Sequence, residues 1–197
     1  MKRWIGSFGL VVFLWPAGAF GQQRPTAEAI ARAQAMAQPG PEHAVLSRLA
    51  GTWDQQVRVW PEPGAQPISS TGVGTAEMIL EGRFLEIRSV VEMFGTRGES
   101  VSILGFDRRH DKYTILGLDT FGTYWVTAAG PASAGKTIVM RGEDVDAIIG
   151  HKQDYEFHVR IDDADTWTME IVFLDEMHTR GQGPFRMVEI VNRRRTQ

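Results

Sequence analysis

Apolar and polar residues alternate along most of the chain after residue 51. In the clearest run, Leu85, Ile87 and Val91 alternate with the charged Glu86 and Arg88. A period of two predicts β-strands with one buried face and one wet face, which is the pattern of antiparallel sheets. Such runs, bounded by turn residues, occupy residues 52–60, 73–81, 83–93, 99–107, 112–119, 122–129, 136–142, 151–162, 165–174 and 183–194.

Most connections between these runs are short, as at Glu81-Gly82, Phe121-Gly122 and residues 162–165. Strands that are neighbours in sequence are therefore expected to be neighbours in the sheet. The longest connection, residues 61–70, is rich in proline and is expected to lie at one end of the sheet. A meander of about ten strands must close on itself or split into two packed sheets, because long open edges promote aggregation.

The two ends of the patterned region favour closure. Gly51 and Trp53 open the first run, and Arg193, Arg194 and Arg195 end the last one. This pairing indicates a sheet whose first and last strands are pinned together. We therefore predict an all-β fold, in which an antiparallel meander of about ten strands closes into a barrel and one or two helices precede it.

Helices are predicted before the strands. Residues 22–38 are mostly Ala, Gln and Arg with few large apolar groups, so we expect a tether or a loosely docked helix. After the helix-breaking Pro39-Gly40-Pro41, Leu46 and Leu49 lie at helical spacing and predict a second helix that ends at Gly51. This second helix is expected to plug one end of the barrel.

The first residues have the pattern of a secretory signal peptide. Lys2 and Arg3 precede an apolar run over residues 4–15, and Ala19 and Gly21 place small residues at the −3 and −1 positions of a cleavage site. The run is shorter than the roughly 20 residues that span a bilayer, so no stable membrane insertion is expected. We predict a periplasmic or secreted protein, cleaved near Gly21.

Cleavage divides the chain into a signal peptide (1–21), an N-terminal tether or helix (22–41) and a β-barrel domain (42–197). It removes two of the 21 Lys and Arg residues and none of the 24 Asp and Glu residues, so the net charge changes from −3 to −5. That balance argues against a nucleic-acid partner. The chain has no cysteine, which excludes disulfides and a cysteine nucleophile.

Several short motifs occur in order between residues 43 and 195. They are Leu49-x-Gly51-x-Trp53, Trp60-x-x-Pro63-Gly64, Gly82-Arg83-Phe84-Leu85, Leu104-Gly105-Phe106-Asp107 with Lys112-Tyr113, Asp119-x-x-Gly122-Thr123 and Met187-x-Glu189-Ile190-x-x-x-Arg194. In these motifs the chain resembles exported members of the domain of unknown function 1579 family. The resemblance implies a calycin-like, lipocalin-like barrel with an apolar ligand cavity, and it supplies no established reaction.

The resemblance also implies roles for particular residues. Trp53 would pack under the barrel floor with Arg194 over its ring, so Gly51, Trp53 and Arg194 are assigned to structural closure. The chain departs from the family in two places. It has Gly117-Leu118 where relatives often carry Trp before the Asp, and it has Asn192 where they often carry Tyr. Both departures are expected to alter the cavity.

The apolar strand faces supply the candidate ligand-binding residues of the lumen. A barrel of about ten strands is wider than the eight-stranded barrel that side chains just fill, which favours a cavity over a filled core. The expected partner is a small hydrophobic molecule. The lumen candidates are Leu85, Ile87, Val91, Trp125, Tyr155, Phe157, Trp167, Met169, Ile171 and Phe173.

Three alternative functions stay open: a haem-binding barrel that uses one histidine, an enzyme acting on a small apolar substrate, and a closed barrel that serves as a partner-binding module. No catalytic residue, metal site or cofactor is assigned, and Glu189 is expected to face outward into a salt bridge. The histidines lack a metal-site spacing. They are His43, His110, His151, His158 and His178.

Overall fold

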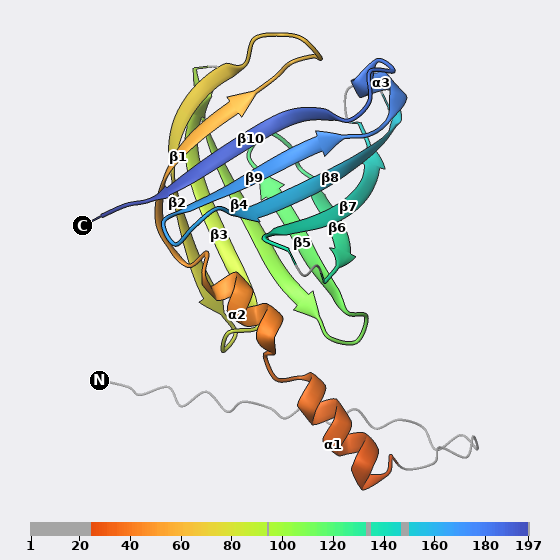
Figure 1. Cartoon of the computed structure of the whole chain (residues 1–197). Helices are drawn as coiled ribbons and strands as arrows, with labels where there is room; N and C mark the ends of the chain where they lie inside the picture. Colours follow the sequence, from red (N-terminus) through yellow and green to blue (C-terminus); the bar gives the residue numbers. More distant parts are fainter. Residues whose placement is uncertain (1–24, 94, 133–134, 147–149, 197) are drawn as a thin grey trace, which may run out of the picture.

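The computed structural model describes residues 25–93, 95–132, 135–146 and 150–196, so the predicted signal peptide lies outside the described residues. The strands form one closed antiparallel barrel in the order β1-β10-β9-β8-β7-β6-β5-β4-β3-β2 (Figure 1). This confirms the predicted closed meander. The strands are β1 Gly51–Val59, β2 Ile68–Ile79, β3 Phe84–Met93, β4 Thr96–Asp107, β5 Lys112–Asp119, β6 Trp125–Pro131, β7 Thr137–Val145, β8 Lys152–Ile161, β9 Thr166–Phe173 and β10 Phe185–Arg194.

Three helices accompany the barrel in the described part of the chain. Helix α1, Ala27–Met36, has no buried residue, as expected for a loosely docked segment. Helix α2, Pro41–Ser47, lies across the lower end of the barrel (Figure 1). Helix α3, Glu176–Thr179, was not predicted and lies at the upper rim, in the connection between β9 and β10.

The lower end of the barrel is filled, and we call this region the floor. Leu46 of α2 and Leu49 after it are 0% and 1% exposed. Above them, Leu85, Leu104 and Met140 point inward from the strands and are equally buried. The second helix therefore plugs one end of the barrel, and the burial of its apolar side chains supplies the main stabilisation there.

The closure of β1 on β10 is built around Trp53. Arg194 is its register partner on β10, and the guanidinium carbon lies 4.2 Å from the centroid of the indole. The Trp53 Nε1–H donates to the carbonyl oxygen of Leu49 at 2.9 Å. Gly51 adopts a φ of +144°, and a Cβ atom there would collide with the Arg194 guanidinium. The contact implied by the resemblance is present, and it requires glycine at position 51.

A second, outer set of contacts holds the same seam. Glu189 points outward, as expected, and pairs with Arg58 at 2.8 Å and with Arg186 at 2.7 Å. The Arg186 guanidinium also lies 4.6 Å from the centroid of the Trp60 ring. These contacts connect β1, β10 and the chain just after β1 on the outside of the barrel.

The barrel wall is weakest between β6 and β7, where the described residues form one register pair, Ala129 with Arg141. Tyr155 on β8 compensates for this. Its ring crosses the position of Gly142 on β7, and its hydroxyl donates to the carbonyl oxygen of Thr127 on β6 at 3.2 Å. A side chain at position 142 would occupy the space of that ring, so a glycine allows the bridge.

Candidate functional site

The inner face of the barrel changes from large apolar residues near the floor to small ones near the upper end. Ser89 on β3 pairs with Ser100 on β4, and Ser102 on β4 pairs with Ile87 on β3 and Gly117 on β5. Directly paired residues share a face, so these residues face inward with the buried Ile87. They are nevertheless partly exposed, whereas the inward side chains of the floor are not. Serine and glycine occupy less volume than the leucines and methionine of the floor, so the inner face is less filled in this upper half of the barrel, which we call the upper lumen.

The opposite side of the upper lumen is aromatic and apolar. In a ring of ten strands, β8 and β9 lie across from β3 and β4. They present Tyr155 and Phe157 from β8, and Ile171 and Phe173 from β9. Tyr155 packs edge-to-face on both phenylalanines, at centroid distances of 5.8 and 6.5 Å. The upper lumen therefore has one wall of Ser and Gly facing one wall of large apolar side chains.

A cluster of three polar side chains, which we call the polar layer, lies on the inner face of β1, β3 and β10, and it consists of Gln55, Ser89 and Asn192. The Nε2 atom of Gln55 donates to Asn192 Oδ1 at 2.9 Å and to Ser89 Oγ at 3.0 Å. Gln55 and Asn192 are 5% and 0% exposed. Buried amides are costly unless their hydrogen bonds are made, so the layer has to be well ordered.

The backbone fixes the orientation of both amides. Asn192 Nδ2 donates to the carbonyl oxygens of Trp167 and Ile190, at 3.3 Å in each case. Asn192 Oδ1 must then point at Gln55, which directs Gln55 Nε2 toward it. Within the described part of the chain, no donor reaches Gln55 Oε1, and the Ser89 hydroxyl hydrogen has no acceptor.

Two glycines on β2 make room for the layer. The Gln55 side chain crosses β2 to reach Ser89 on β3, and a Cβ atom at Gly74 would lie 2.6 Å from Gln55 Nε2. A Cβ atom at Gly72 would lie 3.3 Å from Gln55 Oε1. Because β2 runs downward from its upper end, Gly72 is nearer the mouth than Gly74. The unpaired oxygen of Gln55 is therefore on the upper-lumen side.

The structure places the lumen candidates in three groups. Val91 and Ile171 are partly exposed on the inner face. Trp125 is 64% exposed beside Val126, which packs on the core, so its predicted inward position is wrong. The remaining candidates belong to the buried core, and they are Leu85, Ile87, Tyr155, Phe157, Trp167, Met169 and Phe173.

The polar layer was missed because lumen residues were sought only among apolar side chains. Gln55 is a polar residue at an inward-facing position of β1, between the inward-facing apolar residues Trp53 and Val57. Asn192 was noted only as a departure from the family pattern. The available signal was a polar residue at an inward position of each closing strand. A pair of alternate glycines at 72 and 74 was a second signal, since it marks close approach of another group.

One buried polar atom in this region has no partner. Trp167 is 2% exposed, and among the described residues its Nε1 is a fully buried side-chain nitrogen or oxygen without a hydrogen bond. Its ring packs edge-to-face on Trp53, with centroids 6.0 Å apart. Such an unsatisfied donor costs about 1 to 3 kcal/mol of stability.

The histidines lie away from the described inner face of the strands. His43 lies in α2 and accepts from the Gly40 amide at 3.0 Å, while His110 and His151 are exposed. His158 lies on the outer face beside Glu156. His178, in α3, contacts Asp175 at 2.8 Å and stacks on Phe173. The inward-facing strand positions described thus carry no histidine, and the described residues contain no metal-binding cluster.

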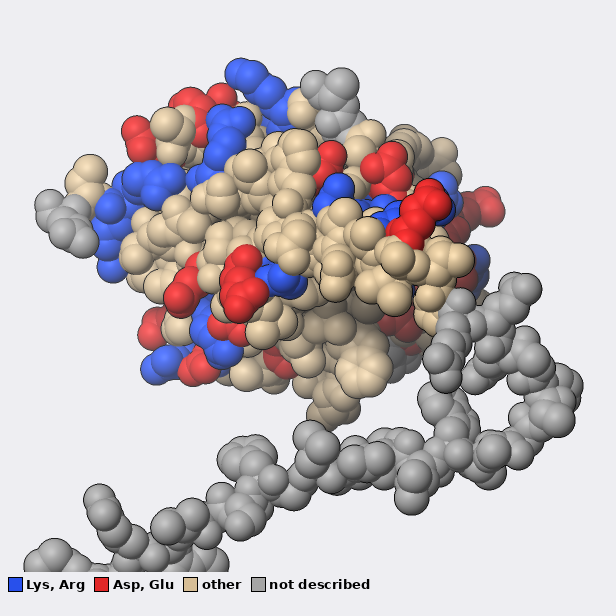
Figure 2. Space-filling model, turned by 90° about the horizontal axis from the view of Figure 1, so that it is seen from below, with Lys and Arg blue, Asp and Glu red and all other residues tan. Residues whose placement is uncertain are grey.

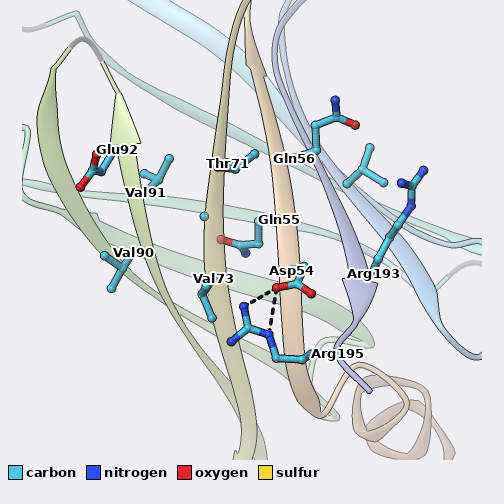
Figure 3. Close-up of a pocket in the computed structure, with 12 residues that line it drawn as sticks. Asp54, Gln55, Gln56, Thr71, Val73, Val90, Val91, Glu92, Arg193 and Arg195 are labelled. Atoms are coloured by element: carbon cyan, nitrogen blue, oxygen red, sulfur yellow. Dashed lines mark hydrogen bonds and ion pairs between the residues drawn. The ribbon is translucent and has the colours of Figure 1, made fainter. Parts of the chain in front are cut away.

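A groove of ≈ 720 Å³ runs over the outside of β1, β2, β3 and β10 (Figure 3). Val73 and Val90, which pair across β2 and β3, form part of its apolar surface. Asp54 and Arg195 form an ion pair at its edge. These four positions face outward, and the inward positions Gln55, Gly72 and Val91 also line the groove.

The lower face of the molecule carries mixed charge. Figure 2 shows basic and acidic side chains interleaved across this face, with uncharged surface between them. The residues drawn in colour form no continuous basic surface there. Binding of nucleic acid through this face would lack the extended positive field that such proteins use.

Comparison with known proteins identifies the family. A family model described as protein of unknown function (DUF1579) matches residues 38–194. The chain belongs to this family. No curated protein matches the chain. The DUF1579 match spans the barrel from before α2 to Arg194, and it includes the three strands that carry the polar layer. Among the described residues, no helix is long and apolar enough to cross a membrane.

Proposed function

We propose that this DUF1579 protein binds a small, mainly hydrophobic molecule in the upper lumen of its barrel. The observation that carries the proposal is the inner wall of small, partly exposed residues, Ser89, Ser100 and Ser102, which lies opposite the apolar wall of β8 and β9. A ligand there would cover the partly exposed Val91 and Ile171, and apolar surface removed from water contributes about 25 cal/mol per Å² before ordering costs. No reaction is proposed. Export to the periplasm or medium stays a prediction from residues 1–21.

The rigid floor supports this reading. The plug formed by Leu46 and Leu49 and the closure at Trp53 fix the lower strand ends, so the upper half need not collapse on itself to keep the barrel folded. A pre-formed site of this kind lowers the ordering cost of binding.

The test is a titration with an environment-sensitive apolar dye, N-phenylnaphthylamine. Ser102 faces the lumen, and its neighbour Ile103 faces outward on the same strand. Ser102→Phe should fill the upper lumen and weaken dye binding by about tenfold or more, whereas Ile103→Phe should leave it unchanged. Circular dichroism would show whether both variants are folded.

Saturable binding that responds to Ser102→Phe and not to Ile103→Phe supports the lumen. Equal binding by both variants would show that the dye binds outside the lumen, for example in the outer groove. Absence of saturable binding by the wild-type protein, both to the dye and to long-chain alcohols, would refute the proposed function.

A further inference from the structure

The free hydrogen-bonding groups of the polar layer restrict the chemistry of a ligand in the upper lumen. Gln55 Nε2 donates one hydrogen to Asn192 Oδ1 and the other to Ser89 Oγ. Gln55 Oε1 is left as an acceptor. Ser89 Oγ accepts from Gln55 and retains its own hydrogen as a donor. The layer therefore presents one acceptor and one donor at neighbouring positions.

A hydroxyl group matches this pair because it is both a donor and an acceptor. It can donate to Gln55 Oε1 and accept from the Ser89 hydroxyl at the same time. A carboxylate can only accept, so one of its oxygens would face Gln55 Oε1 without a proton between them. An alkyl end would leave both protein groups without a partner, which also costs free energy.

Charge around the upper lumen disfavours an anion as well. Arg194, the nearest cation on the inner face, lies below the polar layer over Trp53 and is held by Asp165 and the carbonyl of Ala50. At the rim, Asp119 pairs with Ser100 and Asp144 pairs with Gln153 on the inward register. A buried carboxylate would meet acids at the entrance and no described cation inside, and an unpaired buried charge is costly.

Toward the upper opening of the barrel, the rest of the ligand would meet apolar side chains. Above the polar layer stand Phe157, Ile171 and Phe173 on one side. At the upper end, the ring of Phe121 lies against Gly98, where a Cβ atom would be 2.5 Å from its Cζ atom. Phe121 is otherwise exposed, so an apolar chain leaving the lumen passes beside it.

We infer that the ligand is an amphipathic molecule with an uncharged hydroxyl head held by Gln55 and Ser89 and an apolar tail directed to the mouth. This inference rests on the proposed function and adds the class of ligand. It assigns specificity to Gln55 and Ser89, and a positioning role to Asn192, which orients the Gln55 amide.

The experiment compares decanol, decanoate and chlorodecane as competitors of the dye at neutral pH. Decanol should bind about tenfold more tightly than decanoate, and more tightly than chlorodecane, which lacks the hydroxyl. Ser89→Ala should weaken decanol by about threefold to tenfold and leave chlorodecane unchanged. Ser69→Ala, at an exposed serine on the outer face of β2 that pairs with Arg58, is the matched control and should change neither competitor.

The outcomes separate the two proposals. Equal displacement by the three competitors, or a decanol affinity that Ser89→Ala leaves unchanged, would overturn the hydroxyl head while the lumen site stands. Tighter binding of decanoate would likewise overturn it. Failure of the dye and of all three competitors to bind would remove the proposed function and this inference together.

Discussion

Trp53 and Trp167 show how two residues of the same type, both buried at 1% and 2% exposure, take different roles. The Trp53 indole nitrogen donates to Leu49, and its face carries the Arg194 cation. The Trp167 indole nitrogen has no acceptor. Both rings contribute apolar burial, but only Trp53 adds a hydrogen bond and a cation–π contact to the closure of the barrel.

We therefore expect Trp53→Phe to cost more stability than Trp167→Phe. The two substitutions remove the same atoms, and phenylalanine still offers a ring face to Arg194, so their difference reports the Trp53 hydrogen bond and the weakening of the Arg194 contact, about 1 to 3 kcal/mol in total. Urea unfolding of the two variants measures this difference. Equal losses, or a larger loss for Trp167→Phe, would show that the Trp53 hydrogen bond and the Arg194 contact add little to the closure.

At the scale of elements, α2 depends on its surroundings. A helix of seven residues is too short to be stable alone, so capping and burial must hold it. The Gly40 amide donates to His43 Nδ1, which ties the first turn to its N-cap. Burial lowers the pKa of His43, and the charges of Arg108 and Arg83 act in the same direction, against the opposing effect of Glu42.

This shift makes the floor sensitive to acid. The folded pKa of His43 lies below the unfolded value of 6.5, so the unfolded chain binds the proton more readily and acid favours unfolding. Stability should fall as the pH drops from 6.5 toward the folded pKa, by at most about 1.4 kcal/mol per pH unit from this group.

His43→Gln is the test, because glutamine can accept from the N-cap amide without titrating. The variant should lose part of the slope of urea midpoint against pH in that window. His151→Gln, at an exposed position, is the control and should keep the wild-type slope. An unchanged slope in His43→Gln would assign the acid sensitivity to other groups.

The strands differ in how far the sequence could predict them. The alternation in β3, β8 and β9 is strong because large apolar residues face in and charged residues face out. Strand β2 begins at Ile68, five residues before its predicted start at 73, because Ser69, Ser70 and Thr71 give no contrast between faces. Trp125 was placed inward because alternation defines two faces without saying which one is buried.

The polar layer was beyond a sequence prediction for a different reason. Gln55 and Asn192 are 137 residues apart along the chain, and they meet only because β1 pairs with β10 in this register. A shift of one residue in either strand would turn the amide of that strand outward and separate the pair. The pairing of β1 with β10, which was predicted from Gly51 and Trp53, therefore also creates the candidate site, although neither residue belongs to that site.

At the scale of the whole molecule, stability and binding are assigned to different ends of the barrel. The floor is packed by α2, Trp53 and the large apolar residues, while the upper lumen has serine and glycine on one wall. The polar layer lies between them and serves both ends. The hydrogen bonds that Gln55 makes to Asn192 and Ser89 stabilise the barrel, while Gln55 Oε1 and the Ser89 hydroxyl hydrogen are left for a ligand.

A double-mutant cycle on Gln55 and Asn192 separates these two contributions. Gln55→Leu alone leaves Asn192 Oδ1 without its donor, and Asn192→Leu alone leaves Gln55 Nε2 with one partner fewer, so each should cost about 1 to 3 kcal/mol. Replacing both amides leaves neither one without its partner. The double variant should therefore lose less stability than the two single variants lose in total, and the difference should be about 0.5 to 3 kcal/mol.

The double variant should still bind the apolar dye, with no preference for decanol over chlorodecane. Urea unfolding and dye competition on the four proteins give both readings, and additive losses in stability would show that the two amides do not depend on one another.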